Sequence, residues 1–179
     1  MDPPILNLDC LLACLAHRDD GYADNAEVAA PILDRLGLSA TLFVATRVVG
    51  TQKRPPGMPG RPAEADGLES GRQAAPSRPR RRAHTVTHAR VSAVRGSEPE
   101  REPQDSRRRP KSELGEPVRH LAYPFGGPGD CDFVARQAAQ QAGYRCCLSR
   151  HGGLIAPTDS PFRLNRISIS PRYHATPRA

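Results

Sequence analysis

Large aromatic side chains and long hydrophobic runs are scarce in this sequence. Its 179 residues include four Phe, four Tyr and no Trp, and only 37% of them are hydrophobic. That fraction is low for a compact domain of this size, although the length suffices for one domain with a buried core. No stretch approaches the roughly 18 apolar residues that a membrane-spanning helix requires. We therefore expect a single domain over residues 1–179, with no membrane span.

Cysteine pairs with the spacing of a metal or redox motif are also absent. The five cysteines, an odd number with no Cys-x-x-Cys, are Cys10, Cys14, Cys131, Cys146 and Cys147. They give neither a disulfide framework nor a zinc-ribbon signature, and reduced thiols in the cytoplasm fit them best. The segment before Cys14 has no basic residue that could begin a secretion signal. We expect a cytoplasmic protein, with the cell envelope as the alternative if the N-terminus is damaged.

Positive charge is concentrated in the middle of the chain. The formal net charge is +7, and residues 51–120 hold about 16 Lys and Arg against 9 Asp and Glu, whereas the remainder is balanced. Residues 51–82 and 95–112 are rich in Pro and Arg and have few large apolar side chains. Such segments cannot bury enough surface to offset the entropy of ordering them. We interpret both as disordered or out-of-frame segments within the domain.

Helix and strand patterns alternate on either side of this basic region. Residues 22–37 have the apolar spacing of a helix that ends at Gly37, and a second helix over about 132–142 can be capped by Asp130 or Asp132. The segments with a strand pattern are residues 40–45, 120–125, 144–148 and 162–170. Repeated alternation of this kind predicts an α/β fold with parallel strands.

Two adjacent carboxylates and a pair of histidines are the most informative residues. Asp19 and Asp20 stand together in Asp-Asp-Gly-Tyr, and His84 and His88 enclose Thr-Val-Thr further along the chain. Histidines four positions apart lie on the same face of a helical turn, so both imidazoles can reach one ion. One Asp with two His makes three protein ligands and leaves a coordination position open for water. That arrangement is typical of a catalytic metal site.

Three motifs in this order resemble the polysaccharide deacetylase family, also called the NodB-homology domain or carbohydrate esterase family 4. They are DDGYADN from Asp19, HTVTH from His84 and AYPFG from Ala122. The third motif is that of the YPFG-like branch, and the resemblance covers about residues 17–49, 83–94 and 105–168. It implies a distorted or incomplete (β/α) barrel, here interrupted by a disordered basic Pro/Arg-rich segment. Catalytic residues would lie at the C-terminal ends of the strands.

The resemblance also implies a hydrolytic mechanism. Asp20, His84 and His88 would hold a divalent metal, with Zn2+ the best-fitting ion, although such ligands also admit cobalt, manganese or iron. Asp19 would be the general base on metal-bound water, and the backbone N–H of Phe125 would help to hold the oxyanion. The reaction would remove N-linked or O-linked acetyl groups from the sugars of a polysaccharide. The implied partner is an acetylated amino-sugar polymer or oligosaccharide, and no stable protein partner is inferred.

Two departures from the family pattern affect the residues that handle protons. Many members have an Arg in the third motif that orients the catalytic Asp, whereas this sequence has Ala122 there. Arg163 or Arg166 can supply the missing charge, and strand alternation leaves the choice between them open. We select Arg166. The late Leu-x-His that supplies a general acid in the family is absent, so the sequence assigns no general acid.

Two other interpretations stay open at this point. The arginine-rich stretches 78–82 and 107–109 suit a basic, largely disordered protein that binds nucleic acid. Against this, these stretches contain no interleaved aromatic residues for base stacking. The other interpretation is an inactive remnant of a deacetylase, in which the motif residues persist but the site does not assemble.

Overall fold

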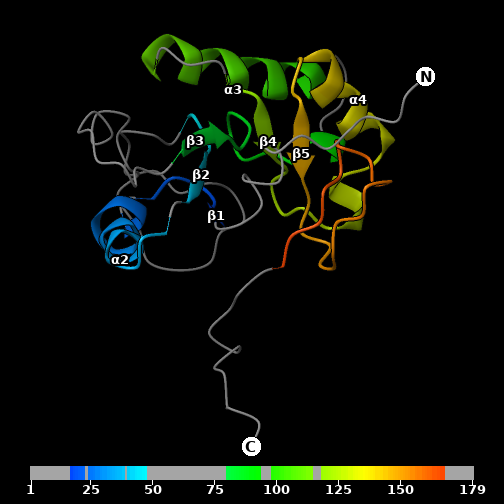
Figure 1. The fold of residues 1–179 in the computed structure, drawn as a ribbon. Helices are drawn as coiled ribbons and strands as arrows, with labels where there is room; N and C mark the ends of the chain where they lie inside the picture. Colours follow the sequence, from blue (N-terminus) through cyan, green and yellow to red (C-terminus); the bar gives the residue numbers. More distant parts are fainter. Residues whose placement is uncertain are drawn as a thin grey trace, which may run out of the picture.

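Five parallel strands form the centre of the protein. The computed structural model describes residues 17–22, 24–38, 40–47, 80–93, 98–114 and 118–167. Its strands are β1 (His17–Arg18), β2 (Thr41–Val44), β3 (Arg80–Ala83), β4 (His120–Ala122) and β5 (Cys146–Leu148). They form one sheet in the order β1-β2-β3-β4-β5, and every neighbouring pair is parallel. Sheet order that follows chain order is the winding of a (β/α) barrel, and the curled sheet forms half of one (Figure 1). The expected incomplete barrel is confirmed.

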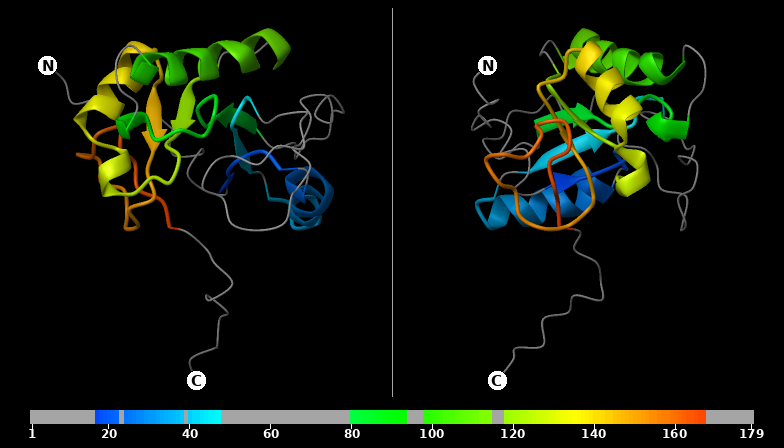
Figure 2. Two further views of the ribbon diagram at one scale, coloured as in Figure 1. Left: turned by 180° about the vertical axis from the view of Figure 1, so that it is seen from behind. Right: turned by 90° about the vertical axis from the view of Figure 1, so that its right-hand side faces the viewer.

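Helical segments lie between β1 and β2, between β3 and β4, and between β4 and β5. The connections contain η1 (Asn25–Ala29), α2 (Ala30–Arg35), η3 (Val91–Ala93), α3 (Glu98–Leu114), η4 (Pro128–Asp130) and α4 (Phe133–Gln141). Helices α3 and α4 pack against each other beside β3, β4 and β5, whereas α2 lies near β1 and β2 at the opposite end of the sheet (Figures 1 and 2). No helix in the described segments is both long enough and apolar enough to span a membrane.

The predicted elements around β4 and β5 are largely confirmed. Asp132 caps α4, because its carboxylate accepts a hydrogen bond from the backbone N–H of Ala135 at 2.9 Å. The strand predicted over 162–170 is wrong for its described part, residues 162–167, which forms only a single parallel bridge between Leu164 and Leu148. The reason is a turn in which the N–H of Arg163 donates to the carbonyl of Ser160, which interrupts the ladder beside β5.

The prediction that residues 95–112 are disordered is wrong for residues 98–112, because they belong to α3, whereas the out-of-frame alternative stays a prediction. Three residues at the i, i+3, i+4 spacing of one helix face hold this helix in place. Pro103 accepts a hydrogen bond from the hydroxyl of Tyr144 at 2.9 Å, and Ser106 is fully buried. Arg107 donates to the carbonyls of Val118 and Ala142. The average composition of the segment gives no sign that the few residues that contact the rest of the protein lie on one face of the helix.

The prediction that residues 51–82 are disordered is wrong at the C-terminal end of the segment. Residues 80–82 lie in β3, which pairs with β2 in a register that sets Thr41 beside Arg80 and Val44 beside Ala83. The Nε of Arg82 donates to Nδ1 of His120 at 3.0 Å, so the side chain of this arginine links β3 to the neighbouring strand β4. Residues 51–79 lie outside the described residues, and the out-of-frame hypothesis stays a prediction for them.

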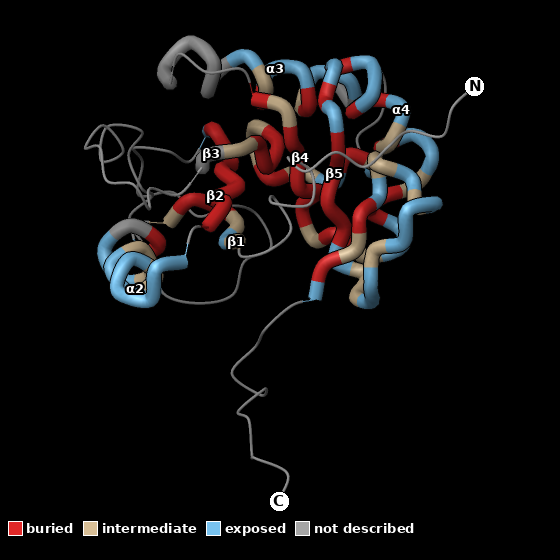
Figure 3. Tube along the Cα trace, viewed as in Figure 1, coloured by how far each residue is buried: buried red, intermediate tan, exposed pale blue. Residues whose placement is uncertain are grey.

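The core lies on both faces of the sheet, where β2, β4 and β5 are buried along their length and β3 is buried at Ala83 (Figure 3). Cys146 and Cys147 illustrate the two faces, since neighbouring strand residues point in opposite directions. Cys147 packs in the cluster under α4 with Ala135 and Ala139, whereas Cys146 packs with Phe43. Both thiols are buried, and neither forms a disulfide with another described cysteine.

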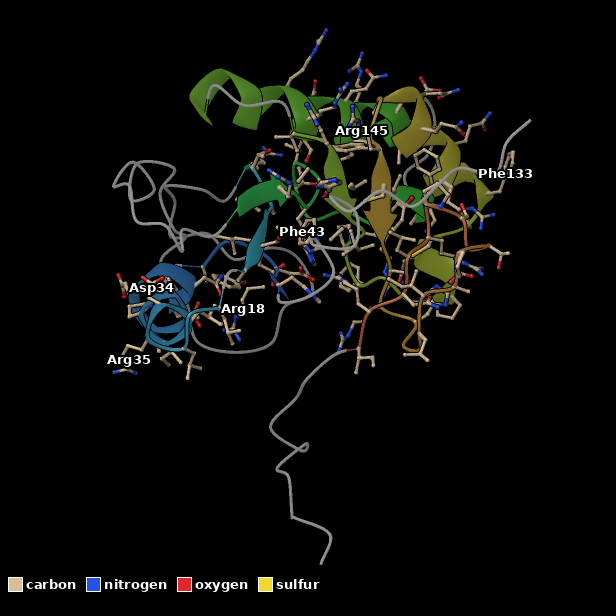
Figure 4. The ribbon with its side chains drawn as sticks, in the orientation of Figure 1. Arg18, Asp34, Arg35, Phe43, Phe133 and Arg145 are labelled. Atoms are coloured by element: carbon tan, nitrogen blue, oxygen red, sulfur yellow. The ribbon has the colours of Figure 1, made fainter. Side chains whose placement is uncertain are left out.

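Helix α2 contributes little to this core. The expected apolar stripe, which runs from η1 through α2 to the residue after it, remains at the surface, with exposed fractions of 57% for Val28, 42% for Ile32 and 65% for Leu36. Asp34 and Arg35 project from the same helix away from the sheet (Figure 4). The apolar spacing therefore correctly predicted a helix here but not its burial.

Candidate active site

The residues singled out by the sequence follow the C-terminal ends of three strands of the sheet. Asp19 and Asp20 come directly after β1, His84 comes directly after β3, and Phe125 lies in the loop after β4. Because the strands are parallel, these ends meet at one edge of the sheet. Residues far apart in the sequence are thereby brought into one cluster.

Asp20, His84 and His88 form a compact group of metal-ligating side chains. All three are buried, and their donor atoms lie within 4.8 Å of one another. Oδ1 of Asp20 is 3.4 Å from Nε2 of His84 and 3.2 Å from Nε2 of His88. Two donor atoms on a tetrahedral zinc ion, with bonds of about 2.0–2.1 Å, stand about 3.3 Å apart. These separations therefore fit a shared metal ion.

The tautomer of His84 also suits a metal ligand. Its Nδ1 lies 2.8 Å from the carbonyl oxygen of Ala122. Since a carbonyl only accepts hydrogen bonds, Nδ1 carries a proton, and Nε2, which faces Asp20, is the nitrogen that could bind a metal. A backbone carbonyl on the far nitrogen is a common way to orient a ligating imidazole.

The electrostatics of this group favour a cation. Burial opposes ionisation of Asp20, but its contacts with His84 and His88 hold the pKa of this carboxyl well below its usual range. Burial lowers the pKa of His84, whereas Asp19 and Asp20 raise it, and the net shift is upward. Positive charge is thus stabilised between the carboxylates and the imidazoles, as a divalent cation requires.

Backbone strain is concentrated at the same place. Among the described residues, the non-glycine residues with a positive φ are Asp20 (76°), Thr85 (61°), His88 (62°) and Phe125 (63°). Each such conformation costs free energy and persists only where the surroundings fix it, as commonly happens at functional sites. Gly21 continues the strained turn with a φ of +83°, and a Cβ there would lie 2.8 Å from Cγ1 of Val44. The turn therefore requires glycine at this position.

Asp19 is held by Arg166 through two parallel hydrogen bonds. The guanidinium nitrogens lie 2.9 and 3.0 Å from the two carboxylate oxygens. Arg166 is buried and is itself fixed by donating from Nε to the carbonyl of Ser149 at 2.8 Å, whereas Arg163 is exposed. Burial raises the pKa of Asp19, but Arg166 and His84 outweigh this, so the pKa lies below its ordinary value.

Phe125 lies in a tight three-residue turn. The N–H of Gly126 donates to the carbonyl of Pro124 at 2.7 Å, which leaves Phe125 at the centre with its positive φ. Its ring packs against the imidazole of His88, with the ring centres 4.8 Å apart, and under the guanidinium of Arg90 at 4.3 Å. The turn that carries the expected oxyanion donor thus contacts one of the candidate metal ligands.

Sequence similarity now identifies the family. The polysaccharide deacetylase model matches residues 17–147, which is most of the chain. The chain belongs to the polysaccharide deacetylase family. The members of this family are hydrolases that remove acetyl groups from polysaccharides, as the three motifs implied.

Individual relatives are distant. YxkH of Bacillus subtilis (strain 168), described as a candidate polysaccharide deacetylase, is 22% identical over 153 residues, which are 86% of this chain and 50% of that protein. The chain thus spans half the length of this relative. A deacetylase of Streptococcus pyogenes, PplD in complex with acetate, superposes with a TM-score of 0.75 at 21% identity, covering 93% of this chain and 74% of that one. IcaB from Ammonifex degensii gives 0.69 at 18% identity, covering 87% and 67%. These structures support the fold.

Some interactions around this candidate site could not be predicted from the sequence. His17 on β1 packs edge-on against Phe43, and burial together with Arg166 lowers its pKa to about 4. Asp130, considered above as a helix cap, instead accepts from the N–H of Gly127 and from Arg90 at 2.6 Å. Arg90 lies two residues after His88, but the sequence does not indicate that Asp130, 40 residues further on, is its partner.

Proposed function

We propose that this protein is a metal-dependent hydrolase that removes acetyl groups from N-acetylated or O-acetylated sugars of a polysaccharide. Asp20, His84 and His88 would hold the metal, with Zn2+ as the favoured ion. When bound there, the cation polarises the acetyl carbonyl and lowers the pKa of water. The observation that carries the proposal is the convergence of these three buried donors at separations suited to one ion.

Asp19 is the proposed general base. Its carboxylate is ionised because its pKa is held below the ordinary value. The side chain is 29% exposed, so a water molecule can reach it. It would accept a proton from the water that attacks the acetyl carbon. Arg166 would keep both carboxylate oxygens in place through its two hydrogen bonds.

The third motif would stabilise the oxyanion. As the acetyl carbon becomes tetrahedral, its oxygen gains negative charge and needs a fixed donor. The backbone N–H of Phe125 is the candidate, and its turn is fixed by the hydrogen bond from Gly126 and by the packing of its ring on His88. A donor fixed before the reaction needs no reorganisation when charge develops.

The test is acetate release from N-acetylglucosamine oligomers and from O-acetylated xylan, measured with zinc-loaded and chelator-treated protein. We expect release from at least one of the two substrates with zinc, none after chelation, and recovery when zinc is restored. A zinc-loaded protein that releases no acetate from either would contradict the proposal and favour the inactive remnant.

Arg166→Gln is expected to lower kcat by about 100-fold, which is the cost of misplacing a catalytic group by roughly 1 Å. The acid limb of the pH–rate profile is also expected to move to higher pH. Arg166 holds the pKa of Asp19 down, and without it the effect of burial, which raises that pKa, prevails. Initial rates between pH 4 and 9 measure both changes.

Arg163→Gln is the matched control for this variant, because Arg163 lies three residues earlier and is exposed. It should leave both kcat and the pH profile unchanged. If Arg166→Gln has the same acid limb as the wild-type protein, Arg166 does not act on the base, whatever happens to the overall rate.

A further inference from the structure

The loop between the two site histidines is held by a carboxylate from a distant helix. Oε2 of Glu102 on α3 accepts hydrogen bonds from the backbone N–H groups of Val86 and Thr87 at 2.8 and 3.0 Å. Its Oε1 accepts a third from the hydroxyl of Thr87 at 2.8 Å. Successive N–H groups that point toward one side form a concave site for an anion, and here Glu102 supplies that anion.

This loop is the part of the site that most needs support. Thr85 and His88, on either side of the residues that Glu102 binds, have φ values of 61° and 62°. The left-handed conformation is unfavourable for a non-glycine residue. Two strained residues within four positions will relax unless other contacts fix them. Relaxation would change the direction in which the imidazoles of His84 and His88 point.

Glu102 is attached to a well-anchored helix. The neighbouring Pro103 is fully buried and accepts a hydrogen bond from the hydroxyl of Tyr144 at 2.9 Å. One turn further on, Arg107 donates to the backbone carbonyls of Val118 and Ala142 at 3.1 and 2.7 Å. These contacts fix the position of the helix, so the carboxylate of Glu102 resists movement of the loop.

We propose that Glu102 is a positioning residue of the metal site. It holds residues 85–88 in the strained conformation in which Nε2 of both His84 and His88 faces Oδ1 of Asp20. It thereby sets the metal affinity of the site without touching the ion. This inference rests on the proposed function, because it assumes that the three donors bind a metal.

The experiment is a zinc titration of metal-free protein against a competing chromophoric chelator. We expect Glu102→Ala to bind zinc about 10–100-fold more weakly than the wild-type protein, which is the usual cost of losing a group that orients a metal ligand. Glu102→Gln should recover part of this loss, because its amide oxygen can still accept from both N–H groups. Thr87→Val removes only the third hydrogen bond, and its affinity should fall less than that of Glu102→Ala.

The control is Glu100→Gln, which changes an exposed glutamate two residues earlier on the same helix and should bind zinc like the wild-type protein. The visible spectrum of the cobalt-substituted proteins adds a readout of ligand geometry, and we expect it to change in Glu102→Ala at saturating metal. Circular dichroism checks that each variant is folded. If Glu102→Ala does not fold, Glu102→Gln and Thr87→Val decide the matter.

The outcomes separate this inference from the proposed function. Wild-type affinity in folded Glu102→Ala, or in both milder variants, would overturn the positioning role while leaving the metal site intact. Equal affinity with a lowered melting temperature would mean that Glu102 supports the fold alone, which also overturns it. If the wild-type protein binds no zinc, the proposed function fails and this inference fails with it.

Discussion

Asp19→Asn is expected to lower kcat for acetate release by about 10²–10⁴-fold, the usual contribution of a general base. Asparagine has nearly the same shape as aspartate, but its amide cannot accept a proton from water at neutral pH. Asp19 lies outside the group formed by Asp20, His84 and His88, so zinc binding should persist. Loss of rate with retained zinc separates the base from the metal ligands.

The measurement is kcat and KM for acetate release, with the zinc content determined on the same samples. KM should change much less than kcat, because Asp19 acts on the attacking water and not on the bound sugar. A variant that keeps more than about a tenth of the wild-type kcat would contradict the assignment of Asp19 as the base. Another residue would then have to accept the proton.

Asp20→Asn is expected to reduce acetate release by more than about 100-fold. Losing a group that merely orients a ligand costs roughly 10–100-fold, and a neutral amide is a much poorer ligand than a carboxylate. Asparagine is chosen over alanine because the φ of Asp20 is 76°, a conformation that Asn tolerates better. The rate should recover partly at high zinc concentration, because the defect lies in binding.

Asp34→Asn is the matched control, since Asp34 lies on the outer surface of α2 (Figure 4). Its acetate release should equal that of the wild-type protein at every zinc concentration. An Asp20→Asn variant with wild-type activity at limiting zinc would show that Asp20 is not a metal ligand.

The sequence predicts the part of this protein that depends on short motifs and local patterns. Asp20, His84 and His88 could be grouped before the fold was known, because their residue types and spacing have few other chemical uses. Helix α4 could be predicted because Asp132 at its start and Gly143 after its end are local signals. Such features depend on neighbours in the chain, which a sequence reveals directly.

Contacts between distant segments account for what the sequence did not reveal. The composition of α3 predicts disorder, because the stability of this helix comes from Tyr144 and from the carbonyls that Arg107 reaches. Glu102 was missed for the same reason. The choice between Arg163 and Arg166 depended on which side chain turns toward Asp19, 147 residues away from Arg166 in the sequence. Strand alternation alone does not specify that direction when the strand is irregular.

In the function proposed above, Asp20, His84 and His88 together bind one metal ion. The most direct test is a titration of metal-free wild-type protein with zinc, followed by measurement of bound zinc, with Asp20→Asn in parallel. We predict saturation at about one zinc ion per chain for the wild-type protein, and much weaker binding for the variant. No saturable binding by folded wild-type protein, or equal binding by both proteins, would contradict the claim.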